Sequence, residues 1–427
     1  MSMTRRSFLS SSALGAGVAL AGCASPRGPE EPAASSALPE SIRSLKPMTG
    51  DVVPISDDER RARLERAREL MAANRIDAIY VEPGSTLFYF TGVRWSGAER
   101  MFAMVLPAKG DLAWVCPGFE EDRARELVRF GDDIRRWEED ESPYQVVAGI
   151  FRDRGIRTGT IGIEERTRFF LYDGVRQVAP ALTYVSADPV TAGCRVVKSA
   201  TELALMQKAN DITIEAFRAS IAALKEGMTP AEFTALSQEA HRALGAAGSI
   251  SASFGLATSF PHGSVQPQRL QQGDIVLMDG GCGVDGYRSD ITRTMVFGTP
   301  SARQREIWDL EQRAQAAAFA AAKPGVACED VDAAARTVIT DFGFGPDYKV
   351  PGLPHRTGHG IGLDGHEWTN LVRGNKTPLA PGMCFSNEPM VVVPGEFGVR
   401  LEDDFYVTED GVKYFSRPSP SIEQPLA

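Results

Sequence analysis

The chain has 427 residues, a formal net charge of -10, 43% apolar residues and 24% charged residues. This length predicts about two or three domains, and the composition is typical of a globular enzyme. No run of about 18 apolar residues marks a membrane-spanning helix. No stripe of lysine and arginine interleaved with aromatic residues follows the first residues, which argues against a nucleic-acid-binding protein. The six cysteines form no CxxC pair, which argues against a zinc knuckle or a disulfide scaffold.

The first 22 residues have the pattern of an export signal. Residues 4–9, TRRSFL, are typical of a twin-arginine motif, and the weakly apolar stretch after them ends in LAGC at residues 20–23. That ending is similar to a bacterial lipobox, which implies a lipid on Cys23 and a protein anchored at the periplasmic side of the cell envelope. The alternative is a disordered tail with a chance arginine pair. Residues 23–50 are rich in Pro, Ser, Ala and Glu, which predicts a flexible linker.

Residues 51–190 are predicted to form a domain of helices and strands. Residues 58–74 have apolar positions at helical spacing. Strand-like runs follow at residues 76–81, 87–91, 101–106, 112–116, 160–164 and 182–185. Lys109 and Gly110 predict the turn of a hairpin. No constellation of catalytic residue types is found in this half.

Residues 191–427 are predicted to form a second domain of the α+β class, because helices and short strands do not alternate regularly. Three capping boxes mark helix starts, at Ser199-x-x-Glu202, Thr229-x-x-Glu232 and Ser301-x-x-Gln304. We expect these helices to end near Gly227, Gly245 and residues 323–325, and a fourth helix at residues 329–342.

Two segments of the second domain share one pattern. In each, a glycine precedes a carboxylate by six residues, at residues 273–279 and 382–388, and a turn then leads to a second carboxylate. The carboxylates are Asp279 and Asp290 in the first segment, and Glu388 and Glu402 in the second. Opposite residues of a hairpin lie about 4.5–5.5 Å apart, so each pair can share a site. The pattern predicts two similar hairpins that bring four carboxylates together.

Four converging carboxylates repel one another, so they take up protons or bind metal ions. Residues 355–367 hold three of the five histidines, and the glycines among them argue against a helix of the HExxH type. Extended alternation would place His355 and His359 on one face, so one can bind metal while its neighbours handle substrate. Carboxylates with one imidazole suit Mn²⁺, with Co²⁺ or Zn²⁺ as alternatives. A lone Asp at a strand end is more often a turn residue, so the prediction depends on the whole set.

Six motifs carry a family resemblance that extends over nearly all of the chain after residue 50. They are FPHG (260–263), MDGG (278–281), YRSDITRT (287–294), HRTGHGIGLDGHE (355–367), NEP (387–389) and GVRLED (398–403). In these motifs and their order, the sequence resembles the X-Pro peptidases, prolidase and aminopeptidase P, of the methionine aminopeptidase and creatinase superfamily. The resemblance implies a pita-bread catalytic domain, a preceding creatinase-like N-terminal domain and a homodimer.

The resemblance also implies a site with two divalent metal ions. Asp279 would bind one ion, and Asp290 and Glu402 would bridge the pair. His359 and Glu388 would complete the other ion. The expected activity is hydrolysis of the peptide bond next to proline in dipeptides or short peptides.

Further residues match the family's catalytic positions. Glu388 is the expected proton shuttle. His262 and His366 match histidines that contact the substrate and stabilise the tetrahedral intermediate, which requires donors about 2.7–3.1 Å from the developing oxyanion. His355 and Arg400 match site residues whose roles are less defined.

Two departures from the family pattern concern the substrate rather than the metal ions. Family members commonly have proline after the His-Glu pair and glycine after the Glu-Pro pair, whereas this chain has Trp368 and Met390. These positions line or neighbour the substrate cleft in the resembled fold. The alternatives are therefore a metal hydrolase of the same fold that acts on another amide or a phosphoester, and a non-catalytic peptide-binding module. The complete ligand set argues against the second alternative.

Overall fold

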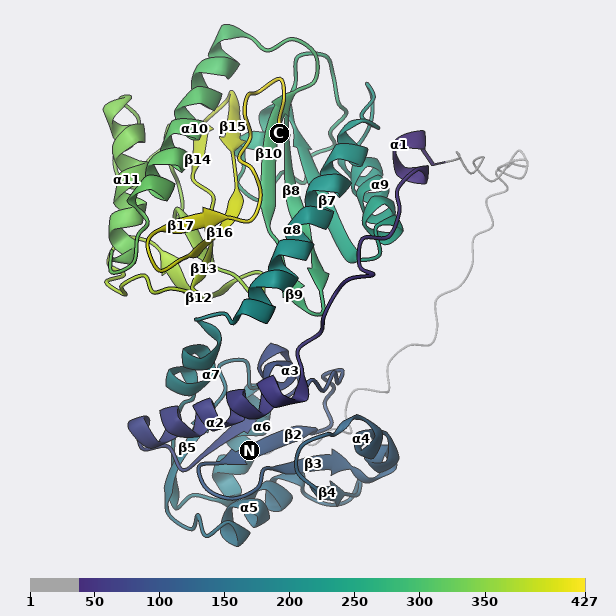
Figure 1. Cartoon of the computed structure of the whole chain (residues 1–427), viewed down its shortest axis with the longest axis vertical. Coiled ribbons are helices and arrows are strands. Elements are labelled where there is room, and N and C mark those ends of the chain that lie inside the picture. Colours follow the sequence, from purple (N-terminus) through teal and green to yellow (C-terminus); the bar gives the residue numbers. More distant parts are fainter. Residues whose placement is uncertain (1–37, 427) are drawn as a thin grey trace, which may run out of the picture. The chain divides into compact units, whose positions relative to one another are not determined.

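The computed structural model describes residues 38–426, which form two domains joined near residue 196 (Figure 1). The predicted signal at residues 1–22 and the predicted lipid site at Cys23 lie outside the described residues. Within the described range, no helix is both long enough and apolar enough to cross a bilayer. The five cysteines of this range are buried free thiols, at positions 116, 194, 282, 328 and 384.

The N-terminal domain is built on a six-stranded mixed sheet with the order β4-β3-β2-β1-β5-β6. Its strands are β1 (Ala78–Val81), β2 (Ala103–Pro107), β3 (Ala113–Pro117), β4 (Asp133–Trp137), β5 (Gly159–Ile163) and β6 (Leu182–Ser186). Its helices are α2 (Asp57–Asn74), α3 (Ser85–Thr91), η1 (Gly118–Glu120), α4 (Glu121–Leu127), α5 (Pro143–Asp153), α6 (Phe169–Val178) and α7 (Asp188–Arg195). The predicted hairpin is present as β2 and β3, in which Met104 lies opposite Trp114. Residues 87–91, predicted as a strand, instead belong to helix α3; the run is buried on all sides, so its sequence has no alternation that separates strand from helix.

Residues 39–50 differ from the flexible linker that the sequence predicts. The short helix α1 (Glu40–Arg43) packs on α8 and α9 of the C-terminal domain, and Ile42 is only 1% exposed. Ser41 Oγ donates a hydrogen bond to the Ala219 carbonyl, and the Met48 amide donates to the Leu244 carbonyl, both at 2.9 Å. A segment with one deeply buried apolar side chain has no sequence periodicity, so its composition did not reveal this packing.

The C-terminal domain combines three sheets with four long helices, as the α+β prediction requires. One sheet has the order β10-β8-β7, with β9 paired to β8; a second has the order β12-β11-β13-β16-β17; β14 and β15 form the third. The strands are β7 (Ala247–Phe254), β8 (Ile275–Val284), β9 (Tyr287–Arg288), β10 (Ile291–Val296), β11 (Gly358–Gly360), β12 (Glu367–Leu371), β13 (Cys384–Asn387), β14 (Met390–Val393), β15 (Phe397–Arg400), β16 (Asp403–Val407) and β17 (Val412–Tyr414).

The helices of the C-terminal domain begin at or next to their predicted starts, three of them at capping boxes. They are α8 (Ala200–Ile221), α9 (Pro230–Ala243), α10 (Ala302–Ala321) and α11 (Cys328–Asp341), with the short helix η2 (Gly255–Ser259) between β7 and β8. In α8, α9 and α10 both hydrogen bonds of the capping box are formed. α8 ends at Ile221, six residues before the expected stop at Gly227. Helix α10 packs on β13, β14 and β15, and α11 packs on α10 and β12, within a large apolar core that includes Trp308 and Phe385.

Candidate active site

The two predicted hairpins are present, and Thr292 joins them. In the first, Asp279 of β8 pairs with Thr292 of β10, so Asp279 and Asp290 lie diagonally across the hairpin rather than directly opposite. In the second, the β13–β16 and β14–β15 registers place Glu388 opposite Glu402. Thr292 also forms a β-bridge with Glu402. The backbone therefore brings all four carboxylates to one place.

A cavity of about 440 Å³ lies at this junction. It is lined by all nine residues that the sequence singled out, namely His262, Asp279, Asp290, His355, His359, His366, Glu388, Arg400 and Glu402, together with Pro261 and Arg356. The structure thus collects residues from the η2–β8 connection, both hairpins and the β11–β12 segment.

The ligating atoms form two groups that share Glu402. His359, Glu388 and Glu402 make one group, and Asp279, Asp290 and Glu402 make the other; within each, the ligand atoms lie within 4.8 Å of one another. A shared carboxylate between two groups is the arrangement that a bridged pair of ions requires. A third group joins Asp290 and His359 with His366.

The carboxylates have the electrostatics of a metal site. Burial, together with the charge of Asp279, raises the pKa of Asp290 well above its usual range. Burial and the charge of Asp290 do the same for Glu402. Burial also raises the pKa of Glu388, to about 7. Glu402 Oε2 accepts a hydrogen bond from Thr292 Oγ at 2.7 Å, whereas its buried Oε1 has no partner among the described residues. These residues fit divalent ions, which would supply the missing positive charge and a partner for that oxygen.

The tautomer of His359 suits a metal ligand. Its side chain is 1% exposed, and burial lowers its pKa to about 3, so the ring is neutral. Nδ1 lies 3.1 Å from the Gly360 carbonyl, which can only accept, so Nδ1 carries the proton. Nε2 keeps its lone pair and lies 3.2 Å from Glu388 Oε1.

Arg400 is the main cation of the cavity wall. Its side chain is 6% exposed, and its Nη2 donates to Asp279 Oδ2 at 2.6 Å. Its Nε donates to Thr292 Oγ at 3.1 Å, and its Nη1 donates to the Pro261 carbonyl at 3.2 Å. Arg400 therefore connects a predicted metal ligand to the segment that carries His262.

The sequence interpretation missed two groups that touch the predicted site. Arg356 lines the cavity, and its Nη2 donates to His366 Nδ1 at 3.1 Å. Asp404 accepts a hydrogen bond from the backbone amide of Asp290 at 2.9 Å through its buried side chain. Both residues stand in quoted motifs or directly beside one, and that adjacency was the available signal.

The residues that depart from the family pattern are not among those lining the cavity. Met390 is fully buried in the core beneath the hairpins, so it does not line the substrate cleft. Trp368 is 51% exposed and follows the segment that carries His366.

Comparison with known proteins matches both domains. Residues 204–409 match the model of metallopeptidase family M24, and residues 63–197 match the creatinase/prolidase N-terminal domain. An Xaa-Pro dipeptidase of Lactobacillus helveticus is 32% identical over 84% of this chain and 98% of its own length. The chain belongs to metallopeptidase family M24. It is therefore a hydrolase of the prolidase-like type, with the pita-bread catalytic domain that the sequence resemblance implied.

Other relatives agree in both sequence and fold. A probable dipeptidase, PepE, of Mycobacterium bovis is 36% identical over 81% of this chain and 92% of its own length. The crystal structure of dipeptidase PepE from Mycobacterium ulcerans superposes with a TM-score of 0.80 at 32% identity, over 88% of this chain and all of that one. A prolidase from Thermococcus sibiricus superposes with a TM-score of 0.77 at 28% identity, over 84% of this chain and 96% of that one.

Proposed function

We propose that this metallopeptidase hydrolyses the peptide bond on the amino side of proline in dipeptides or other short peptides, with two divalent ions. Mn²⁺ is the proposed metal, with Co²⁺ and Zn²⁺ as alternatives. The observation that carries the proposal is the shared position of Glu402 in two ligand groups within one cavity. The names of the Xaa-Pro dipeptidase relatives support the preference for proline.

Divalent ions held by these ligands supply Lewis-acid activation of the scissile carbonyl and of water. The chain's own residues handle the protons and the substrate. In the proposed mechanism, the Glu388 carboxylate accepts a proton from the attacking water. It then gives this proton to the proline nitrogen, which carries no hydrogen of its own and cannot leave without one.

The remaining cavity residues bind and orient the substrate. Arg356 donates a hydrogen bond to His366 Nδ1, so Nδ1 acts as the acceptor and carries no proton. His366 must therefore present Nε2–H to the cavity. In the proposed mechanism, this N–H and His262 donate to the carbonyl oxygen as negative charge develops there. His355 is neutral, since burial lowers its pKa to about 4, and its Nδ1 donates to the Arg356 carbonyl at 2.7 Å.

The test is hydrolysis of X-Pro dipeptides, X-Pro tripeptides and matched X-Ala peptides by metal-stripped protein, before and after Mn²⁺, Co²⁺ or Zn²⁺ is added. Metal-dependent cleavage confined to the proline peptides supports the proposal, and the tripeptides separate dipeptidase from aminopeptidase activity. Metal-dependent cleavage of X-Ala peptides at equal rates refutes the preference for proline. Metal binding without peptide cleavage would favour the alternative hydrolase of another amide or a phosphoester.

We also propose that the protein is exported by the twin-arginine route, carries a lipid on Cys23, faces the periplasm and acts as a homodimer. The motifs at residues 4–9 and 20–23 support export and lipidation. Labelling with radioactive palmitate should be lost in Cys23→Ala, and export should be lost when Arg5 and Arg6 are both replaced by lysine. Light scattering of the protein lacking residues 1–38 tests the dimer, because a monomer mass would exclude it.

A further inference from the structure

The ring centroid of His366 lies 3.9 Å from that of His359, and its Nδ1 accepts a hydrogen bond from Arg356. His366 is exposed and follows Gly365, in a bend between β11 and β12. Its flanking residues, Asp364 and Glu367, are acidic, and their side chains are only 14% and 5% exposed. Beyond these contacts of its ring, the position of the backbone that carries His366 depends on what holds these two carboxylates.

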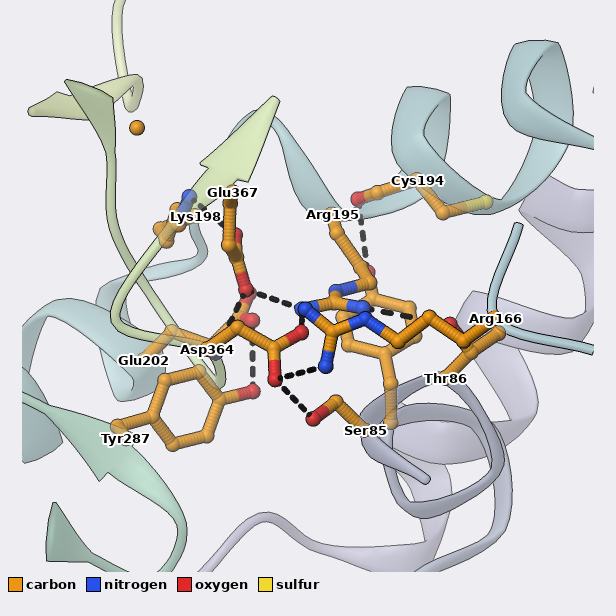
Figure 2. A network of polar contacts seen from close by, with 12 residues as sticks. Ser85, Thr86, Arg166, Cys194, Arg195, Lys198, Glu202, Tyr287, Asp364 and Glu367 are labelled. Atoms are coloured by element: carbon orange, nitrogen blue, oxygen red, sulfur yellow. Dashed lines mark hydrogen bonds and ion pairs between the residues drawn. The ribbon is translucent and has the colours of Figure 1, made fainter. Parts of the chain in front are cut away.

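The cations that hold them come from the N-terminal domain and the start of the catalytic domain (Figure 2). Arg195, the last residue of α7, places Nη2 between both carboxylates: it donates to Asp364 Oδ2 at 2.6 Å and to Glu367 Oε1. Lys198 Nζ donates to Glu367 Oε2 at 3.0 Å. Arg166 Nη1 donates to Asp364 Oδ1 at 2.9 Å.

Hydroxyl groups complete this network. Ser85 Oγ donates to Asp364 Oδ1 at 2.6 Å, and Arg195 Nη1 donates to Thr86 Oγ at 3.2 Å. Both hydroxyls belong to α3 of the N-terminal domain. Within the bend itself, the Asp364 amide donates to Glu367 Oε1 at 3.1 Å, which closes the loop around His366.

The charges of Glu367 and Arg195 make this network a permanent tether of the bend rather than a pH-dependent switch. Burial alone would raise the pKa of Glu367, but Lys198 and Arg195 lower it to about 2. Burial opposes the charge of Arg195, yet Glu367 and Asp364 raise its pKa above the ordinary arginine range. Glu367 and Arg195 therefore stay ionised at neutral pH. Removing one partner of such a buried pair leaves an uncompensated charge, so the geometry is strongly held.

We propose that Arg195 is a positioning residue that uses the N-terminal domain to hold His366 over the catalytic cavity. It touches neither the cavity nor a predicted metal ligand, and it acts through Asp364 and Glu367 on either side of the histidine. This inference rests on the proposed function insofar as His366 contacts the substrate. Its structural half, the tether on residues 363–367, does not depend on the substrate.

Arg63 provides the matched control for Arg195. Its side chain is 6% exposed, and it also joins the two domains, with Nη2 3.4 Å from Glu202 Oε1 and 3.2 Å from the Tyr287 hydroxyl. None of its hydrogen bonds or ion pairs reaches residues 363–367. Arg63→Met and Arg195→Met therefore each remove one buried interdomain arginine, but only the second releases the His366 segment.

The first measurement is hydrogen exchange of the metal-stripped proteins, followed by mass spectrometry of peptides covering residues 361–371. These peptides should exchange faster in Arg195→Met than in the wild type, and at the wild-type rate in Arg63→Met. Equal exchange of these peptides in the two variants would refute the proposal that Arg195 tethers residues 363–367. If Arg195→Met does not fold, Asp364→Asn removes one charge of the same bend and should give the same local increase. Because this measurement uses no substrate, its outcome does not depend on the proposed activity.

The second measurement is a double-variant cycle with His366→Ala in the metal-loaded enzyme, on the substrate that the peptide panel identifies. Arg195→Met should lower kcat about 10- to 100-fold, the effect typical of outer-shell positioning groups, with KM and metal content little changed. In the His366→Ala background it should cause no further loss, because the residue it positions is gone. Losses that multiply in the double variant, or an equal loss of kcat in Arg63→Met, overturn the inference.

Discussion

Glu388 should make the metal-free protein less stable as pH rises, and the size of this effect follows from its surroundings. Burial raises the pKa of its carboxyl group from 4.5 to about 7 in the folded chain. Since the folded pKa is the higher one, the stability contributed by this group is fully present below about pH 4.5 and is lost as pH rises through about pH 7. A rise of this size predicts that about 2–3 kcal/mol is lost between about pH 5 and pH 8.

The assay is urea unfolding of metal-stripped wild type and Glu388→Gln, followed by tryptophan fluorescence at both pH values. The difference between the two proteins reports Glu388 together with its effect on Asp290 and Glu402, whose pKa values its charge helps to raise, because titrating groups elsewhere occur in both. His355 and His359, whose pKa values burial lowers, contribute the opposite trend and cancel in this difference. From about pH 5 to pH 8, the variant should gain about 2–3 kcal/mol relative to the wild type. Adding Mn²⁺ should favour the wild type instead, since the variant lacks a ligand. A difference that stays constant with pH would refute the reasoning.

Three further predictions concern catalysis and packing. Metal-loaded Glu388→Gln should lose about 10²–10⁴-fold in kcat. Glu311→Gln, which alters a buried carboxyl outside the cavity lining, should retain activity. Equal losses of kcat in the two variants would contradict the proton-shuttle role. Arg293→Met breaks an ion pair whose partners are both 0% exposed, so thermal or urea unfolding should show a loss of about 3–5 kcal/mol. Arg303→Met, which removes two exposed pairs, with Glu306 and Glu396, should cost less than about 1 kcal/mol, and similar costs for Arg293→Met and Arg303→Met would be inconsistent with the burial argument. Ile42→Ala should release residues 39–50, seen as faster limited proteolysis there at unchanged kcat; an unaltered cleavage pattern would mean that the segment does not depend on this side chain.

Local signals predicted the catalytic domain well. Capping boxes place the starts of three helices because their hydrogen bonds lie within four residues of sequence. The two hairpins followed from turns and carboxylate spacing in the same way. Register was less accessible: Asp279 pairs with Thr292, not with Asp290, because the β9 pairing next to the turn sets the alignment.

The N-terminal domain was predicted less completely, for a physical reason. β4 has the sequence DIRRW, with three charged residues in five, and it is a strand because it pairs in parallel with β3 and because Arg135 bonds Asp133 and Asp153. Such support is tertiary and leaves no alternation in the sequence. The partners of Arg195 are likewise 169 and 172 residues away along the chain, so no local pattern could connect them.

The ionic cluster around Arg195 also shows where this protein can be divided. The family matches end the N-terminal domain at residue 197 and begin the catalytic domain at residue 204, so a cut between them separates Arg195 from Asp364 and Glu367. A catalytic domain produced alone from that point would bring two acidic residues to its new surface without their principal cation. A chimaera with a related enzyme therefore needs its junction before α7, or must exchange Arg195 together with Asp364 and Glu367.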